Sequence, residues 1–286
     1  MRRVGVLTDS TAYLAADLVA ALGIEVVPLE VVLGGVPHPE PSVSSADLAG
    51  ALRRWTPVST SQPSPAAVLD GLRRLQEAGA GSVVAVHLSG EVSGTCAATR
   101  LAARSTDLPV EVVDSRSLAM GLGYAVLAAA RAAADGGDAA AVARAARRTA
   151  EATRVWFCVD TLEHLRRGGR IGAAQALIGS ALAVKPILHL VDGRVQPLEK
   201  VRTSSRAMAR LIELAGAAVS DAAAASATGR AQVTVHHLAS AARAGQLAQA
   251  LQQHLPEGAN VGIVEVGAVV GAHVGPGTVG VVVGPG

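Results

Sequence analysis

The stretch Val4-Gly5-Val6-Leu7-Thr8-Asp9-Ser10-Thr11 joins a short apolar run to four small polar residues. The apolar run predicts a buried β-strand, and the Asp and Ser directly after it favour a turn that caps a helix. The residues that follow predict a helix near Tyr13–Leu22 and a second strand over Ile24–Leu29. Strands that alternate with helices in this way indicate a mostly parallel sheet with helices on both faces.

The same alternation continues through the first half of the chain. Ser64 and Pro65 are residue types preferred at the N-cap and at the first position of a helix. Further strands are expected at Ser82–His87 and Val110–Val113, and further helices at Pro65–Gln76, Ser93–Arg104, Leu118–Ala134 and Asp138–Ala152. We therefore predict an α/β N-terminal domain that spans residues 1–152.

The second half has a different pattern, which begins with a strand over Arg154–Asp160 and a short helix over Thr161–Leu165. Lys185–Leu190 and Val195–Lys200 flank Asp192-Gly193, a pair typical of a two-residue hairpin turn. Further helices are expected from Ser204 and at Ala241–His254, and further strands at Gln232–His237, Val261–Val266 and Thr278–Val283. A hairpin with separate helices predicts a mixed α+β C-terminal domain, residues 153–286.

Composition limits the class of protein. Half of the 286 residues are apolar but only 2% are aromatic, so the core must be aliphatic. The longest apolar stretch, Leu118–Ala134, carries Arg131 and is shorter than the about 20 residues that span a membrane. Arg2 and Arg3 precede an apolar run too short for a signal peptide. With only two cysteines and no disulfide framework, this predicts a cytoplasmic protein without stable membrane insertion.

Charge and motifs argue against several kinds of site. The net charge of +2 is dispersed, and few aromatic side chains are available to stack on bases, so we expect no nucleic-acid partner. His164 and the pair His236-His237 lack the Cys or carboxylate spacing of a metal site. Gly121-Leu122-Gly123 lies inside an apolar helix rather than after a strand, which is not the dinucleotide-binding pattern. We expect neither a metal nor a cofactor.

Four clusters of small polar residues or glycines follow predicted strands or precede predicted helices, the edge at which open α/β sheets bind ligands. They are Thr8–Thr11, Thr60–Pro65, Ser89–Thr95 and Gly271–Gly277. Helix capping alone explains Ser64, whereas Asp9 is a candidate ligand, base or helix cap, and Ser93 is either an N-cap or part of a site. Thr60 and Ser61 are not needed for a cap, and free N–H groups at a helix N-terminus favour an anion beside them. Neither a nucleophile elbow nor a Walker loop is present.

Histidine and arginine provide the other candidate groups. His273 lies in the glycine-rich fourth cluster, where a histidine that only packs in a core is less typical. Gly168-Gly169-Arg170 predicts a helix that ends at glycine, followed by an arginine that is either solvated or available to a ligand. Arg202, Arg206 and Arg210 recur every four residues, a spacing typical of an exposed helix face.

Taken in order along the chain, these clusters resemble the DegV family over essentially the whole sequence. The specific matches are Thr60–Ser64 and the run Leu162–Ile171, which contains Gly168-Gly169-Arg170. Supporting matches are Val6–Thr11, Val27–Leu29, Ser93–Thr95, Val113–Ser115, Lys185–Ile187 and His273–Gly277. One departure is Pro37–Pro41, which lacks the Tyr and Asp of the Gly-x-x-Tyr-x-Asp run that the family usually has there.

The resemblance implies a two-domain DegV-like fold that holds a long-chain fatty acid in a buried tunnel at the domain junction. It implies that hydroxyl groups bind the fatty-acid carboxylate. By position in the motifs, these belong to Thr60 and Ser93, with Ser61 and Thr95 beside them. His273 matches the family's C-terminal histidine and is implied to approach the same carboxylate.

The resemblance also implies a partner and a role. Arg170 and Arg202 match arginines near the tunnel mouth and are expected to contact the head group or the partner protein. That partner would be a fatty acid kinase, similar to dihydroxyacetone kinases, which holds ATP and converts the bound acid to acyl phosphate. The chain itself is then a lipid-binding protein rather than an enzyme.

Two other functions stay open on the sequence alone. An enzyme for a small acyl or phosphorylated substrate would need Asp9, Ser93 and His273 close together, because a nucleophile requires an oriented base. A protein that only binds other proteins would have an empty junction with no tunnel. Turnover of generic acyl esters by the purified protein would support the enzyme, and co-purified fatty acid would support the fatty-acid carrier.

Overall fold

The computed structural model describes residues 3–177, 185–256 and 259–286. The first half forms a four-stranded parallel sheet in which β1, the strand that opens the chain, lies in the middle. Across the sheet the order is β2 (Ile24–Val27), β1 (Arg3–Asp9), β6 (Ala80–His87) and β7 (Val110–Asp114). The parallel sheet predicted from the alternation is therefore present.

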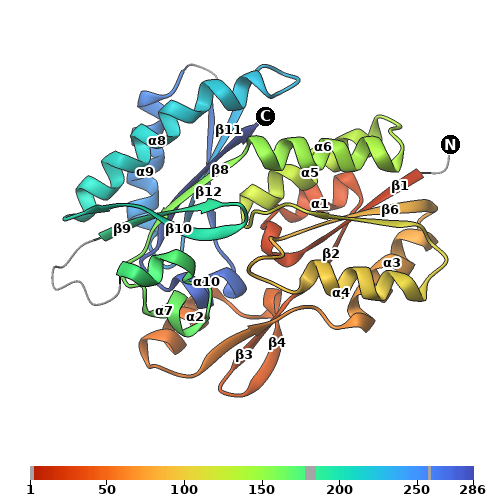
Figure 1. The fold of residues 1–286 in the computed structure, drawn as a ribbon, viewed down its shortest axis with the longest axis horizontal. Helices are drawn as coiled ribbons and strands as arrows, with labels where there is room; N and C mark the ends of the chain where they lie inside the picture. The colour runs from red at the N-terminus through yellow and green to blue at the C-terminus, as the bar shows by residue number, and fades with distance from the viewer. Residues whose placement is uncertain (1–2, 178–184, 257–258) are drawn as a thin grey trace.

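Helices cover both faces of this sheet (Figure 1). On one face lie α3 (Pro65–Glu77) and α4 (Thr95–Ala102), and on the other α1 (Ala16–Leu22), α5 (Met120–Ala134) and α6 (Ala139–Ala152). The predicted cap of α3 is confirmed, since the Ser64 hydroxyl accepts a hydrogen bond from the backbone N–H of Ala67 and Pro65 is the first helical residue. The apolar stretch from 118 is a buried helix, as its composition indicated.

Some predicted boundaries were wrong by a few residues. The helix expected near Tyr13 begins at Ala16, because residues Ser10–Ala12 form a short 3₁₀ turn (η1) and Tyr13 adopts a left-handed φ of 49°. The helix expected at Ser93 begins at Thr95 with Gly94 as its N-cap. Pairing with β1 ends at Val27, ahead of Pro28, which has no N–H to donate.

A second, smaller sheet was not predicted. It is antiparallel, with β3 (Glu30–Leu33) between β4 (Val36–Pro39) and β5 (Val58–Ser61). Along the chain, a 3₁₀ turn, η2 (Glu40–Ser42), and helix α2 (Ser45–Arg53) connect β4 to β5. Gly34 and Gly35 both have positive φ, which is the two-residue hairpin conformation that glycine favours. The sheet is small, but β5 carries Thr60 and Ser61.

The second half forms a six-stranded mixed sheet. Its order is β10 (Arg194–Val201), β9 (Lys185–Val191), β8 (Arg154–Cys158), β13 (Val279–Pro285), β11 (Ala231–His237) and β12 (Asn260–Glu265). Among these pairs only β11 and β12 run parallel. The predicted hairpin is confirmed, because Asp192 and Gly193 both have positive φ between β9 and β10.

Two long helices, α8 (Ser204–Ala224) and α9 (Ala241–His254), cover one face of the six-stranded sheet (Figure 1). Short helices α7 (Glu163–Arg167) and α10 (Ala268–Val274) lie near the opposite face, where a 3₁₀ turn at Gly172–Leu177 contacts β10. A further 3₁₀ turn, Ala103–Ser105, follows α4 in the N-terminal half. Every strand of the four-stranded sheet precedes Ala152 and every strand of the six-stranded sheet follows it. The division at residues 152 and 153 remains our prediction for the domain boundary.

The two halves share a core and polar contacts. One apolar cluster contains α5 residues such as Leu122 together with Val155 and Phe157 of β8. At the junction, the Ser89 hydroxyl donates to the carbonyl of Gly193, 2.8 Å away, at the hairpin turn. Packing and hydrogen bonds of this kind hold the two sheets on either side of a common interior.

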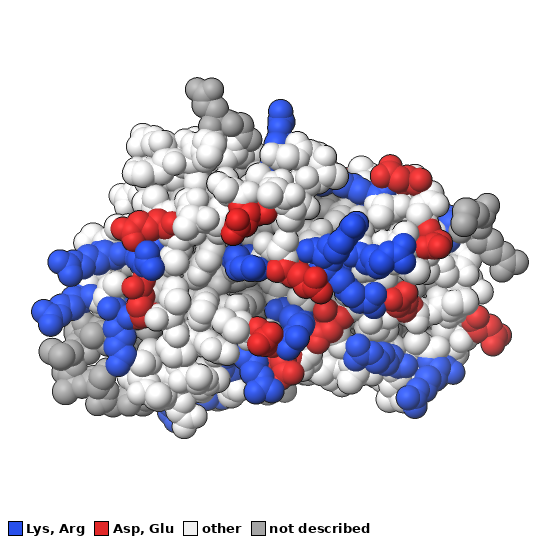
Figure 2. Space-filling model, turned by 45° about the horizontal axis from the view of Figure 1, so that its top comes forward, with Lys and Arg blue, Asp and Glu red and all other residues white. Residues whose placement is uncertain are grey.

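The surface carries charges of both signs. On the face drawn in Figure 2, Lys and Arg side chains lie interspersed with Asp and Glu. Several of these are paired, among them Arg194 with Glu91 across the junction, where Nε and Oε2 are 2.7 Å apart. Within the part of the chain that the structure describes, no helix is both long enough and apolar enough to cross a membrane.

Candidate functional site

A largely apolar cavity of about 350 Å³ lies at the junction. Its size is at the lower end of the roughly 300–1,000 Å³ of small-molecule pockets. Strands β8 and β13, the two residues before α5 and helix α10 supply much of its wall. The apolar lining consists of Leu29, Leu88, Val92, Leu118, Ala119, Val155, Trp156, Phe157, Leu165, Val195, Val266, Val269, Val270, Val274, Val281 and Val282. Such a wall stabilises a flexible aliphatic ligand through burial of apolar surface.

Polar side chains meet the cavity where β5 approaches α10. Thr60 Oγ1 and His273 Nε2 are 2.9 Å apart, and both residues line the cavity. Ser93 also lines it, and Arg170 joins this group because its Nε donates to the carbonyl of Val92, 2.9 Å away. The structure therefore brings together side chains from four distant parts of the sequence, as expected for Thr60, Ser93, His273 and Arg170.

The two adjacent hydroxyls of β5 do not serve the same group. Neighbouring residues of a strand point to opposite faces, so only one of the two can face α10. Thr60 faces His273, whereas the Ser61 hydroxyl donates to Oε2 of Glu30, 3.0 Å away on β3. Although Ser61 contributes to the cavity lining, its hydroxyl already has a partner outside the polar group.

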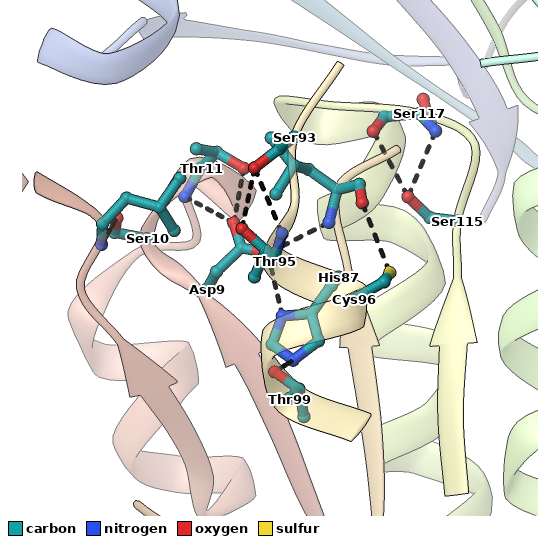
Figure 3. A network of polar contacts seen from close by, with 12 residues as sticks. Asp9, Ser10, Thr11, His87, Ser93, Thr95, Cys96, Thr99, Ser115 and Ser117 are labelled. Carbon is teal, nitrogen blue, oxygen red and sulfur yellow. Dashed lines mark hydrogen bonds and ion pairs between the residues drawn. The ribbon is translucent and has the colours of Figure 1, made fainter. Parts of the chain in front are cut away.

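Ser93 and Thr95 form a pair at the start of α4. Their hydroxyl oxygens are 2.9 Å apart (Figure 3), and Thr95 is fully buried while Ser93 is half-buried. Gly94 rather than Ser93 is the N-cap, so capping leaves the Ser93 hydroxyl available to the cavity. Thr95 does not line the cavity itself and contacts it through Ser93.

His273 is neutral near pH 7, because burial and the nearby Arg170 guanidinium lower its pKa to about 4. Its Nε2 faces Thr60, but its buried Nδ1 has no hydrogen-bond partner among the described residues. A buried polar atom without a partner is unusual in proteins and marks a place where a ligand or water completes the bonding. The histidine therefore has one satisfied and one open ring nitrogen.

The two candidate arginines have different positions. Arg170 follows α7, whose end is shaped by Gly168 as C-cap and Gly169 with a positive φ of 69°. Its side chain is half-buried and lines the cavity, so it is not the fully solvated arginine that the glycine motif also permitted. Arg202 is exposed just before α8 and does not line the cavity.

Asp9, the third group of the enzyme alternative, lies outside the cavity. Its side chain is fully buried, and both carboxylate oxygens are occupied (Figure 3). Oδ1 accepts from the N–H and hydroxyl of Thr11, and Oδ2 accepts from the N–H of Leu88 and lies 3.0 Å from Nδ1 of His87. His87 Nε2 in turn lies 3.0 Å from Thr99 Oγ1. This network holds the ends of β1 and β6 together.

Two buried polar residues in or near the site were missed by the sequence reasoning. His236 lines the cavity, and burial lowers its pKa to about 4, so its ring is neutral. Its Nε2 accepts from the N–H of Met120 at 3.1 Å, and Nδ1 donates to the carbonyl of Val264 at 3.0 Å. The alternation along β11 groups His236 with Gln232 and Thr234 on the polar side of the strand, so no signal for its burial was available in the sequence.

Glu40 is the second missed position. It is only 4% exposed, and it accepts from the Ser10 hydroxyl at 2.5 Å, the Tyr13 hydroxyl at 3.0 Å and the N–H of Val269 at 2.8 Å. Burial is the main reason that the pKa of Glu40 is raised. Since Val269 lies in the first turn of α10, this carboxylate attaches the helix that carries His273 to the N-terminal half.

No metal site is evident in residues 3–177, 185–256 and 259–286, where no three His, Cys, Asp or Glu side chains converge. The site is thus an apolar cavity with hydroxyls, a neutral histidine and a cation at one end. Such an arrangement binds an amphipathic anion through burial of its tail and hydrogen bonds to its head group.

Comparison with known proteins identifies the family. A family model described as "Uncharacterised protein, DegV family" matches residues 3–285. The chain belongs to the DegV family. A DegV domain-containing protein of Streptomyces coelicolor is 50% identical over 283 residues, which are 99% of this chain and 98% of that relative.

Solved DegV structures share the fold. One from Thermus thermophilus, described as showing fatty acid binding, superposes with a TM-score of 0.89 at 32% identity over 99% of both chains. One from Bacillus subtilis, described as a fatty acid binding protein, has a TM-score of 0.87 at 29% identity, also over 99% of both chains. The predicted DegV-like α/β fold is therefore confirmed.

Proposed function

We propose that this DegV protein binds a long-chain fatty acid in the junction cavity and presents its carboxylate to a partner fatty acid kinase, which forms acyl phosphate. The observation that carries the proposal is the cavity, with a largely apolar wall and one polar end. The fatty acid binding described for the related proteins of T. thermophilus and B. subtilis supports the same ligand class.

Burial of the acyl chain supplies the affinity in this proposal. A palmitate-sized tail has about 14 methylenes, each worth about 0.8 kcal/mol on burial, or about 11 kcal/mol in total. Association and ordering of the tail remove a large part of that free energy. The remainder is enough for tight binding without a strong ionic contact at the head group.

The head group is assigned to the polar end. Thr60 and Ser93 donate hydroxyl hydrogen bonds to the carboxylate, Thr95 orients Ser93, and His273 completes the same end of the cavity. Ser61 lines this end, but its hydroxyl stays bonded to Glu30. Hydroxyl donors stabilise the anion without the bidentate pair of hydrogen bonds that a guanidinium makes to both carboxylate oxygens. One carboxylate oxygen therefore stays available as a nucleophile for phosphoryl transfer. The kinase supplies ATP, and this chain supplies no catalytic group.

Arginine contacts with the partner complete the proposal. Arg170 lies at the head-group end of the cavity, and Arg202 is exposed on the surface, where a second protein can reach it. Because the kinase uses cytoplasmic ATP, we place this protein in the cytoplasm. The enzyme alternative is not favoured, because Asp9 lies outside the cavity with both oxygens occupied.

Mass spectrometry of an organic extract of the purified protein tests ligand binding directly. A stoichiometric long-chain fatty acid is expected. Absence of lipid in protein that also fails to take up added palmitate or oleate would contradict the proposal and favour substrate screening of the enzyme alternative.

The kinase step needs a separate test. Protein loaded with palmitate is mixed with ATP and a purified fatty acid kinase from the same organism, and acyl phosphate is trapped with hydroxylamine as a hydroxamate. Hydroxamate should form only when both proteins are present. Binding without any product would retain the fatty-acid carrier and remove the kinase from the proposal.

A further inference from the structure

The loop that carries Ser93 is folded around Ser89. This loop, residues 88–94, connects the end of β6 to the start of α4. The carbonyl of Ser89 accepts hydrogen bonds from the N–H of Val92 at 3.2 Å and from the N–H of Ser93 at 3.1 Å. The position of Ser89 therefore sets the backbone position of Ser93, which lines the cavity.

The hydroxyl of Ser89 connects this loop to the C-terminal half. Ser89 is fully buried, and its hydroxyl donates to the carbonyl of Gly193, 2.8 Å away in the β9–β10 turn, and accepts from the N–H of Glu91 at 3.2 Å. Gly193 is itself buried, although it lies in a hairpin turn. A Cβ atom added to Gly193 would lie 2.3 Å from the Ser89 hydroxyl oxygen. The turn thus packs directly against the loop, with no space between them for a side chain.

Two arginines of the C-terminal half contact the same loop. Arg170 Nε donates to the carbonyl of Val92 at 2.9 Å. Arg194 forms an ion pair with Glu91, in which Nε and Oε2 are 2.7 Å apart, but this pair is largely exposed and contributes little by itself. Together with the buried hydroxyl contact of Ser89, these bonds connect three of the loop residues to the C-terminal half.

We propose that Ser89 is a positioning residue for fatty-acid binding, which holds the loop against the turn at Gly193 and so places the Ser93 hydroxyl at the carboxylate end of the cavity. The proposal rests on the fatty-acid binding proposed above. Ser89 does not line the cavity, so it acts on the ligand through Ser93. Because a hydrogen bond weakens steeply as its angle departs from linear, a displaced loop reduces the contribution of Ser93 without removing its hydroxyl.

A double-mutant cycle measures whether Ser89 acts through Ser93. Calorimetric titration with palmitate compares wild type, Ser89→Ala, Ser93→Ala and the double variant. Ser89→Ala is expected to weaken palmitate binding about 5-fold, because the loop loses its buried contact with the turn. In the Ser93→Ala background the same substitution should change the affinity by less than about 2-fold, since the hydroxyl that Ser89 positions is absent. A second cycle with Thr60→Ala, on β5, should be additive.

Two glycines test the other side of the contact. Gly193→Ala should weaken palmitate binding at least about 5-fold, because its Cβ displaces the turn from Ser89. Gly35→Ala is the matched control, since Gly35 also lies in a two-residue hairpin turn, with a φ of 90° compared with 79° at Gly193, but an added Cβ would meet no atom within 4 Å. It imposes similar backbone strain and should leave palmitate binding unchanged. The cycle with Ser93→Ala applies equally to Gly193→Ala, and it replaces the Ser89 cycle if Ser89→Ala does not fold.

Hydrogen exchange tests the positioning step without a ligand. In ligand-free Ser89→Ala, the N–H groups of Val92 and Ser93 should exchange at least about 10-fold faster than in wild type, because the carbonyl that accepts from both is no longer held in place. The N–H groups of Ala98 and Ala102 in α4 should exchange at the wild-type rate.

Each other outcome contradicts a stated part of the proposal. Equal palmitate affinity in wild type and Ser89→Ala, or an equal loss in the wild-type and Ser93→Ala backgrounds, would overturn the positioning role while the proposed function stands. Unchanged exchange at Ser93, or a loss in Gly35→Ala as large as that in Gly193→Ala, would also overturn it. Wild-type protein that fails to bind palmitate would overturn the proposed function and with it the role of Ser89 in binding, whereas the exchange result is independent of any ligand.

Discussion

Two polar clusters lie at the ends of the N-terminal strands, and they differ in how completely their atoms are bonded. In the network around Asp9, both carboxylate oxygens and both nitrogens of His87 have partners, and every side chain is fully buried. In the cluster around Thr60, the polar atoms face a cavity and His273 has an unpartnered nitrogen. Complete bonding indicates a structural role for the Asp9 network, whereas the Thr60 cluster combines an unpartnered atom with a cavity that a ligand can fill.

The Asp9 network gives the largest expected effect. Asp9→Asn places an amide NH₂ opposite N–H donors, and we expect a loss of about 4 kcal/mol in the free energy of unfolding. Urea unfolding measures this loss, with the exposed Asp17→Asn as the control. If Asp9→Asn is stable but no longer binds fatty acid, Asp9 belongs to the ligand site and the contrast between the Asp9 network and the Thr60 cluster is wrong.

The buried histidines predict a pH dependence of stability. The pKa values of His236 and His273 are lowered from 6.5 to about 4 in the folded protein. Between these values the unfolded chain binds protons that the folded chain does not, so stability falls as pH is lowered. At pH 5 we expect a loss of about 2 kcal/mol for each histidine, relative to pH 7.5.

Variants assign this pH effect to its source. His273→Gln should reduce the loss between pH 7.5 and 5 in ligand-free protein by about 2 kcal/mol, whereas the exposed His254→Gln should leave it as it is. Added palmitate should reduce the His273 share, because a nearby anion favours the imidazolium. A pH dependence that His273→Gln does not alter would show that this ring is not neutral in the fold.

Hydroxyl deletions separate the two faces of β5. Thr60→Ala, the isosteric Thr60→Val and Ser93→Ala should each weaken palmitate binding by about 1–3 kcal/mol, the cost of removing a donor from a buried anion. Ser61→Ala is the matched control, since its hydroxyl bonds to Glu30, and should change binding by at most about 0.5 kcal/mol. Calorimetric titration measures all four. Unchanged palmitate affinity in Thr60→Ala and Ser93→Ala, with the fold intact, would contradict the assignment of these two hydroxyls to the fatty-acid carboxylate.

Adjacent glycines after α7 give the smallest expected effect. A Cβ at Gly168 would approach His273 Nδ1 to 2.1 Å, whereas a Cβ at Gly169 meets no atom within 4 Å but has a positive φ. Gly168→Ala should weaken palmitate binding by about 1 kcal/mol, and Gly169→Ala should lower only the unfolding free energy, also by about 1 kcal/mol. If Gly168→Ala leaves palmitate binding unchanged and Gly169→Ala weakens it, His273 lies outside the ligand site.

Prediction from sequence succeeded where the local pattern was complete. The cap and first turn of α3, the buried helix α5 and the Asp192-Gly193 hairpin all depend on residues close together in the chain. The sheet of β3, β4 and β5 was missed, because its strands are four residues each and β4 contains two prolines. Short strands give too few alternations to define a pattern, and their pairing depends on distant segments.

In the candidate site, too, residues within local motifs were predicted and a residue that depends on distant contacts was not. Thr60, Ser93, Arg170 and His273 were proposed through the family motifs, and the structure brings them together. Glu40 was not proposed, because it lies where the chain departs from the family run, and only its contact with Val269 reveals that it attaches α10. A carboxylate in a proline-rich stretch is indistinguishable from a solvated one until its burial is known.

Residue type and spacing were therefore sufficient for the kind of fold, because helix and strand periodicity, caps and turns act over a few residues. They also restricted the polar candidates to a few motifs. Whether a given hydroxyl, carboxylate or histidine is fully bonded depends on atoms that are distant in the chain. The alternate faces of Thr60 and Ser61, the enclosure of Asp9 and the open nitrogen of His273 became visible only when the two sheets were assembled around the cavity.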